Sequence, residues 1–194
     1  VHGDDFATCG PREGNAWFKE KLQERFEIKT TVLGLGKGEE REARLLNRII
    51  SVDEEGWKYE ADPRHAELMI RGLNLNEAKG VKTPGEDERP WSEEEDAQGL
   101  DAKDSTSYRT LAARANYLSP DRPDAQYAIK EVCRGMSAPT RGDLRKLRRL
   151  ARYFIERPRL VLYFPYQDDD EINKGYSDSD WAGCRRTAKS TSGG

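Results

Sequence analysis

The sequence has few of the residues that build disulfide frameworks, zinc sites and membrane spans. Its three cysteines, Cys9, Cys133 and Cys184, are odd in number and far apart, which excludes a disulfide framework and fits a reducing compartment. The two histidines, His2 and His65, have no partners at metal or catalytic-triad spacing. No apolar run approaches the roughly 20 residues that a membrane span needs, so no membrane partner is expected.

Charge is abundant but unevenly distributed. Charged residues make up 36% of the 194 residues, against 35% hydrophobic residues, so the core is expected to be modest. A net charge of −3 excludes a uniformly basic nucleic-acid binder but allows local basic faces. Residues 85–104 carry nine acidic and two basic residues, a net charge of −7, and predict a flexible, solvated connector. Residues 141–159 carry eight basic and two acidic residues, a net charge of +6.

Hydrophobic periodicity and the positions of proline predict alternating helices and strands. The first ten residues, "VHGDDFATCG", are expected to form a hairpin or a strand and turn. Residues 43–62 are expected to form two short strands joined by an Asp-Glu-Glu-Gly turn. Strands are also expected at 159–166 and within 172–184. Helices are expected at 15–29, 63–75, 105–119, 123–137 and 141–157.

The predicted helix at 141–157 has two distinct faces at about 100° per residue. One arc is apolar and consists of Leu144, Leu147, Leu150, Ala151, Phe154 and Ile155. The other, about a quarter-turn wide, consists of Arg141, Arg145, Arg148, Arg149 and Arg152. Thr140 and Asp143 resemble a capping box that would fix the start of the helix. The basic face is either an ordinary solvated surface or a contact for a nucleic-acid backbone, whose phosphates would relieve the repulsion among the guanidinium groups.

Two pairs of aspartates are candidate metal ligands. Asp4 and Asp5 are adjacent, and they indicate either a solvated hairpin tip or two carboxylates that hold Mg²⁺. Asp178 and Asp180 would share one face of a strand, as a polar edge or as part of a metal site. The glycine-rich "GLGKGEE" is no phosphate-binding loop, because Gly38 follows Lys37 where a Ser or Thr is required. We expect a flexible turn there.

Several blocks occur in an order that resembles the polyprotein of copia-type LTR retrotransposons. "VHGDDF" is similar to the family's aromatic-x-Asp-Asp hairpin, and "KLQERFEIKTTVLG" to its "L…FEMKDLG" stretch. The long segment "YRTLAARANYLSPDRPDAQYAIKEVCRGMSAPT" resembles "YR…VGSLMYLS-TRPDI-x-YAV…LSRFMS-x-PT". "LRKLRRLARYFIERPRLVLYF" and "GYSDSDWAGCRRTAKSTSGG" resemble "A-x-KRILRYLKGT…GL-x-Y" and "GYSDADWAGD…RKSTSGY". The resemblance covers nearly the whole chain, from the reverse transcriptase active-site hairpin to the start of ribonuclease H.

The resemblance implies an α+β fold in four parts. Residues 1–84 would be the end of the polymerase palm with the catalytic hairpin and the primer-grip region, and 85–104 the acidic connector. Residues 105–166 would be helices of the thumb and connection, including the basic helix 141–157. Residues 167–194 would begin a ribonuclease H-like domain.

The same resemblance implies a function. The chain would be a piece of an RNA-directed DNA polymerase with ribonuclease H that copies element RNA into DNA. Asp4 and Asp5 would be polymerase metal ligands, and Asp178 would be the first metal ligand of ribonuclease H, with Mg²⁺ or Mn²⁺ as cofactor. The five arginines would contact the nucleic-acid backbone. Implied partners are an RNA template, an RNA–DNA hybrid, deoxynucleotides and the rest of the polyprotein, inside the cell in cytoplasm, nucleus or a virus-like particle.

Departures from the family pattern leave alternatives open. His2-Gly3 replaces the usual aromatic-x pair, and the other carboxylates of both metal sites are not in this sequence. We therefore expect the chain, as given, to be catalytically inert although its parent is an enzyme. A second hypothesis is a catalytically dead, nucleic-acid-binding remnant of such an element. A third is an interaction surface whose acidic connector binds a basic partner.

Overall fold

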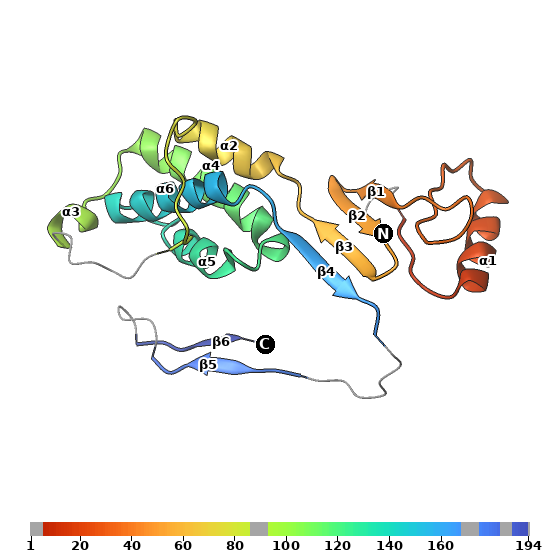
Figure 1. The fold of residues 1–194 in the computed structure, drawn as a ribbon. Helices are drawn as coiled ribbons and strands as arrows, with labels where there is room; N and C mark the ends of the chain where they lie inside the picture. The colour runs from red at the N-terminus through yellow and green to blue at the C-terminus, as the bar shows by residue number, and fades with distance from the viewer. Residues whose placement is uncertain (1–5, 86–92, 168–174, 183–187, 194) are drawn as a thin grey trace. The chain divides into compact units, whose positions relative to one another are not determined.

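The computed structural model describes residues 6–85, 93–167, 175–182 and 188–193, in two compact units, residues 1–164 and 165–194 (Figure 1). The first unit combines helices with a four-stranded antiparallel sheet, which confirms the predicted α+β class. The expected catalytic hairpin at Asp4 and Asp5 lies outside the described residues, and residues 6–9 form no strand. Across the part of the chain that is described, no helix is long and apolar enough to cross a bilayer.

Four helices enclose the main hydrophobic core of the first unit. They are α2 (Arg64–Gly72), α4 (Ala102–Leu118), α5 (Gln126–Arg134) and α6 (Arg141–Glu156). On α4, Tyr108, Leu111, Ala112, Ala115 and Leu118 recur on one helical face and are all buried. The Tyr108 hydroxyl donates a 2.6 Å hydrogen bond to the Val132 carbonyl of α5, which satisfies the polar end of this buried ring. These helices confirm four of the predicted segments.

Local capping defines where these helices begin. The Asp101 carboxylate accepts a 2.7 Å hydrogen bond from the Asp104 amide at the start of α4. At α6, the Thr140 hydroxyl accepts from the Asp143 amide while the Asp143 carboxylate accepts from the Thr140 amide, so the predicted capping box is confirmed. The helix ends at Glu156, one residue before the predicted end. Pro63, the first residue of the predicted helix 63–75, lies just before the first turn of α2.

The sheet contains one more strand than the sequence predicted for residues 43–62. Its order is β1 (Glu42–Leu45), β2 (Arg48–Val52), β3 (Gly56–Glu60) and β4 (Val161–Pro165). The unexpected turn is formed by Leu46 and Asn47, both at positive φ (49° and 64°), so β1 and β2 pair directly. Leucine is rare in this conformation, so the residues at 46 and 47 do not form a pattern that predicts a hairpin. The predicted Asp-Glu-Glu-Gly turn does join β2 to β3, with the Asp53 carboxylate accepting hydrogen bonds from two backbone amides.

The N-terminal helix α1 (Arg12–Gln23) is shorter than the predicted helix at 15–29 and buries none of its residues. Phe26, which the predicted helix included, lies beyond the end of α1 and is 61% exposed. The glycine-rich turn is closed by the carboxylate of Glu39, which accepts a hydrogen bond from the Gly36 amide at 2.7 Å and pairs with Arg12 at 2.8 Å. A Cβ atom at Gly34 would overlap that carboxylate, so a larger residue there would require the Glu39 side chain to move.

The segment 93–104, expected to belong to a flexible connector, is mostly structured. Residues Glu93–Ala97 form the short helix α3, and Gly99 forms a β-bridge with Thr140. The bridge is made by hydrogen bonds from the Leu100 amide to the Pro139 carbonyl (3.0 Å) and from the Arg141 amide to the Gln98 carbonyl (2.9 Å). These backbone bonds hold α3 close to the start of α6.

The described residues of the second unit include an antiparallel pair of strands. Its strands are β5 (Asp178–Asp180) and β6 (Thr191–Gly193), and Asp178 is paired with Gly193. The predicted strand within 172–184 is therefore present but short.

Candidate nucleic-acid interface

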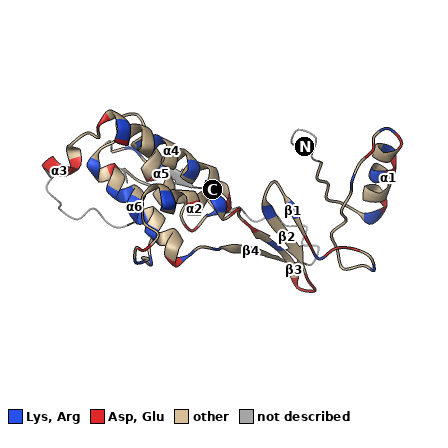
Figure 2. Ribbon diagram, turned by 90° about the horizontal axis from the view of Figure 1, so that it is seen from above, with Lys and Arg blue, Asp and Glu red and all other residues tan. Residues whose placement is uncertain are grey.

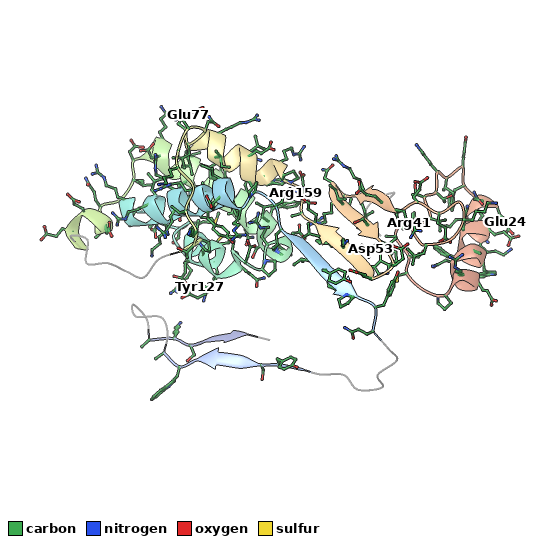
Figure 3. All side chains as sticks on the ribbon, in the orientation of Figure 1. Glu24, Arg41, Asp53, Glu77, Tyr127 and Arg159 are labelled. Carbon is green, nitrogen blue, oxygen red and sulfur yellow. The ribbon has the colours of Figure 1, made fainter. Side chains whose placement is uncertain are left out.

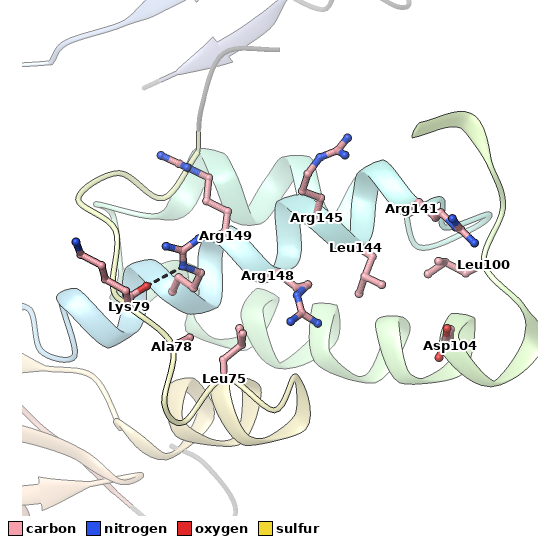
Figure 4. A pocket seen from close by; sticks show the side chains of 11 residues that line it. Leu75, Ala78, Lys79, Leu100, Asp104, Arg141, Leu144, Arg145, Arg148 and Arg149 are labelled. Atoms are coloured by element: carbon pink, nitrogen blue, oxygen red, sulfur yellow. Dashed lines mark hydrogen bonds between the residues drawn. The ribbon is translucent and has the colours of Figure 1, made fainter. Parts of the chain in front are cut away.

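The five arginines singled out in the sequence all line one groove on the surface of α6. The groove has a volume of about 690 Å³, and its lining residues come from α4, α6, the segment that follows α2 and the segment that precedes α4 (Figure 4). Figure 2 shows basic residues spread along α6 and acidic residues on α3. The lining consists of Leu75, Ala78, Lys79, Leu100, Asp104, Arg141, Leu144, Arg145, Arg148, Arg149 and Arg152.

The two-faced pattern of α6 explains why the arginines are displayed here. Leu147, Leu150 and Phe154 are fully buried in the core, as predicted for the apolar arc. Because α6 is fixed by this arc and by the capping box at Thr140, the opposite arc must face outward. The position of the basic face therefore follows from hydrophobic burial, and no charge interaction is needed to explain it.

The groove combines a cationic wall with an aliphatic floor. Leu75, Ala78, Leu100 and Leu144 form apolar parts of the lining, while six lining residues are lysine or arginine. In Figure 4, Arg148 and Leu144 extend from α6 toward α2 and α4, whereas Arg145 and Arg149 extend to the other side of α6. Asp104 is the single acidic residue among the described residues of the lining. Such a surface is suited to an anion that also presents apolar atoms, as a sugar–phosphate backbone does.

Three of the five arginines form hydrogen bonds or ion pairs with other residues of the protein, which the sequence did not predict. We call residues 79–83 the strap, because they run along α6 and bond to it. Arg152 donates through Nε to the Lys79 carbonyl at 2.8 Å, and Arg149 donates through Nη2 to the Thr83 hydroxyl at 2.7 Å. The Val81 amide in turn donates to the Arg152 carbonyl at 3.3 Å. Arg149 and Arg152 therefore hold the strap in place.

The remaining arginines differ in their surroundings. Arg145 forms an ion pair with Asp96 of α3, and both side chains are about one-third exposed. Arg141 and Arg148 are exposed, and neither makes an ion pair or side-chain hydrogen bond with the described residues. Arg141 and Arg148 are thus the positions best placed to contact an external phosphate.

The loop between α4 and α5 carries the most deeply buried charges of the first unit. Arg122 is 2% exposed and donates to both carboxylate oxygens of Asp124, at 2.9 and 2.8 Å. It also donates to the Arg157 carbonyl at 2.8 Å and lies over the Phe154 ring, 4.7 Å from its centroid. Burial alone would raise the pKa of Asp124, but hydrogen bonds from Arg122 and Tyr153 outweigh it, so this pKa lies below its ordinary value.

The neighbouring Asp121 connects the same loop to the sheet. It accepts hydrogen bonds from Arg48 of β2 at 2.9 Å and from the Tyr59 hydroxyl of β3 at 2.5 Å. Burial, together with the hydrogen bond to Asp121, raises the pKa of Tyr59 to about 12. Farther along β3, the Glu60 carboxylate accepts hydrogen bonds from Nε and Nη2 of Arg159, labelled in Figure 3, at 2.5 and 2.7 Å. Because these groups satisfy one another, we interpret them as a structural joint rather than as a catalytic site.

The predicted metal ligands are not brought together by the described structure. Asp4 and Asp5 lie outside the described residues, and Asp178 is described only as the first residue of β5. Among the described residues, no three His, Cys, Asp or Glu side chains gather in a group that could hold a metal ion. The roles of Asp4, Asp5 and Asp178 stay predictions.

Sequence reasoning missed the groove residues that lie outside α6. Lys79, Leu75 and Leu100 join the lining from segments far apart in the sequence. No local pattern marks them, because their proximity depends on the packing of α2 and α4 against α6. The segment "SPDRPD" contains Asp121, Arg122 and Asp124. Its residue spacing does not predict which side chains these three residues bond to.

Comparison with known proteins identifies relatives of this chain. It is 30% identical over 131 residues to an uncharacterized mitochondrial protein of Arabidopsis thaliana, which covers 67% of this chain and 52% of that protein. It is 32% identical over 125 residues to the retrovirus-related Pol polyprotein from transposon RE1 of the same plant, which covers 64% of this chain and 8% of the polyprotein. A match to the corresponding polyprotein from transposon RE2 is 32% identical over 95 residues, or 49% of this chain and 6% of that one.

The chain spans about half the length of the mitochondrial relative and less than a tenth of each polyprotein. No protein-family model matches the chain. No solved structure matches it significantly. The relatives agree with the blocks found in the sequence, and the chain is thus homologous to the Pol polyproteins of copia-type retrotransposons.

Proposed function

We propose that this chain is part of a retrotransposon RNA-directed DNA polymerase with ribonuclease H, and that the groove on α6 holds the backbone of its nucleic acid. The observation that carries the proposal is a groove lined by five arginines and Lys79, of which Arg141 and Arg148 are exposed. The homology to Pol polyproteins supports the same class of partner, because a polymerase of this kind acts on an RNA template and an RNA–DNA hybrid.

The composition of the groove favours contact with the backbone over contact with the bases. Arginine is the residue best suited to phosphate, since its planar guanidinium donates hydrogen bonds in pairs. Each phosphate that it neutralises releases condensed counterions, which drives binding at low salt. No aromatic side chain occurs among the described residues of the lining, so the groove offers no stacking platform for unpaired bases. These features suit a duplex such as an RNA–DNA hybrid.

The catalytic part of the proposal concerns three aspartates. Asp4 and Asp5 are proposed as metal ligands of the polymerase, and Asp178 as a metal ligand of ribonuclease H. Carboxylate oxygens are the ligands that Mg²⁺ and Mn²⁺ prefer, and either ion would stabilise charge on the reacting phosphate. In the complete polyprotein, D4N or D5N should abolish synthesis of DNA from deoxynucleotides. D178N should abolish cleavage of the RNA strand while leaving DNA synthesis intact.

The binding part can be tested on the chain itself. Fluorescence anisotropy with a short labelled RNA–DNA hybrid should show binding at low salt. The double variant R141Q/R148Q should weaken that binding about tenfold or more, because both arginines are exposed and free to contact phosphate. The matched control R25Q/K29Q removes two exposed charges outside the groove and should bind like the wild type. Equal losses in both variants would show that net charge, rather than the groove, governs binding.

A further inference from the structure

The acidic helix α3 lies at one end of the arginine groove. It contains four consecutive acids, Glu93, Glu94, Glu95 and Asp96, and its Asp96 is paired with Arg145 of α6. The pairing joins positions 49 residues apart in the sequence, so it depends on the folded arrangement. The carboxylate of Asp96 therefore pairs with one of the cations that line the groove.

The structure contains features that allow this close approach. A Cβ atom at Gly142 would lie 3.2 Å from Cβ and Cγ of Asp96, so glycine leaves room for α3 to rest on the first turn of α6. The β-bridge between Gly99 and Thr140 tethers the end of α3 to the residue that caps α6. Backbone hydrogen bonds at the tether and the ion pair between Asp96 and Arg145 thus hold α3 against α6.

We propose that α3 is an intramolecular competitor of nucleic acid, which occupies Arg145 with a carboxylate until phosphate displaces it. This inference rests on the proposed function, because it specifies how the same groove is regulated. Displacement breaks a partly exposed ion pair, since the side chains of Arg145 and Asp96 are 36% and 32% exposed. Pairs of this kind are weak, so α3 would reduce affinity by a small factor and would not block binding.

The first test compares affinities for the RNA–DNA hybrid at low salt. D96N should bind the hybrid about two- to fivefold more tightly than the wild type, because the carboxylate of Asp96 no longer competes with phosphate for Arg145. E94Q/E95Q should also bind more tightly, since it removes two exposed negative charges of α3 that would repel the phosphates. The control E13Q makes the same change of net charge as D96N on α1, outside the groove, and should leave affinity unchanged.

The second test separates displacement from a general effect of charge. Hydrogen exchange of amides in residues 93–98 should become faster when the wild-type chain binds the hybrid, because α3 leaves α6. Unchanged exchange in this segment, or equal affinities of D96N and the wild type, would overturn the competition while leaving the nucleic-acid surface in place. If neither the wild type nor D96N binds the hybrid, both proposals are wrong.

Discussion

Replacing Arg122 with methionine tests the claim that the loop between α4 and α5 is a structural joint. Methionine keeps much of the apolar stem that lies over Phe154, but it removes the guanidinium group. The change deletes two charge-assisted hydrogen bonds to Asp124 and one to the Arg157 carbonyl. Asp124 then keeps only the Tyr153 hydroxyl as a side-chain donor among the described residues.

The expected loss follows from burial. The side chain of Arg122 is 3% exposed and that of Asp124 is 20% exposed, so R122M leaves a carboxylate poorly solvated. Breaking a buried ion pair in this way costs about 3–5 kcal/mol in the free energy of unfolding. R122M/D124N should recover part of the loss because no unpaired charge remains, giving a coupling energy of about 1–3 kcal/mol. The control R64M removes a 63% exposed arginine and should cost less than about 0.5 kcal/mol.

Urea denaturation followed by circular dichroism measures these differences at pH 7. The pKa of Asp124 is lowered in the folded state, so its contribution is present above its unfolded pKa and disappears as pH falls through the folded value. The stabilities of R122M and the wild type should therefore converge in strong acid. A loss below about 1 kcal/mol for R122M at pH 7, similar to that of R64M, would refute the reasoning.

Two further predictions concern the strap and the single histidine of the described chain. G80A should destabilise the protein by about 1–3 kcal/mol in the same urea assay. The added Cβ atom would lie 2.8–3.0 Å from atoms of Glu156, including its backbone nitrogen. Unchanged stability would show that the strap moves freely. His65 packs against Tyr117, and burial lowers the pKa of its imidazole. The unfolded state therefore binds more protons than the folded state just below about pH 6.5, so the free energy of unfolding should rise with pH in that range. The variant H65F should lose this rise. If H65F and the wild type had the same pH profile, the lowered pKa of His65 would be contradicted.

The helices could be predicted from sequence because each carries its own signals. The start of α6 was set by Thr140 and Asp143, and proline separated α4 from α5 as expected. The extent of α1 was overestimated, since Phe26 continued the apolar spacing but had nothing to pack against at that point. Periodicity marks a face that could be buried, and only tertiary contacts decide whether it is.

The hairpin and the groove could not be predicted from local patterns. Leu46 adopts a positive φ that its side chain disfavours, and the direct pairing of β1 with β2 is what holds it there. The arginines of α6 were correctly placed on one face. Their partners, however, lie in distant segments. Arg149 and Arg152 hold the strap, which is more than 60 residues away in sequence, whereas Arg148 is exposed. Spacing along one helix contains no information on such partners.

The salt dependence of hybrid binding tests the central claim most directly, because it counts the phosphates that the protein neutralises. The logarithm of the association constant should fall linearly with the logarithm of salt concentration, and each phosphate contact should add about 0.9 to the slope. R141Q/R148Q should reduce the magnitude of that slope by about 1.8, for two lost contacts, while R25Q/K29Q leaves it unchanged. A slope that is the same for the wild type and R141Q/R148Q would contradict the assignment of the α6 groove as the nucleic-acid interface.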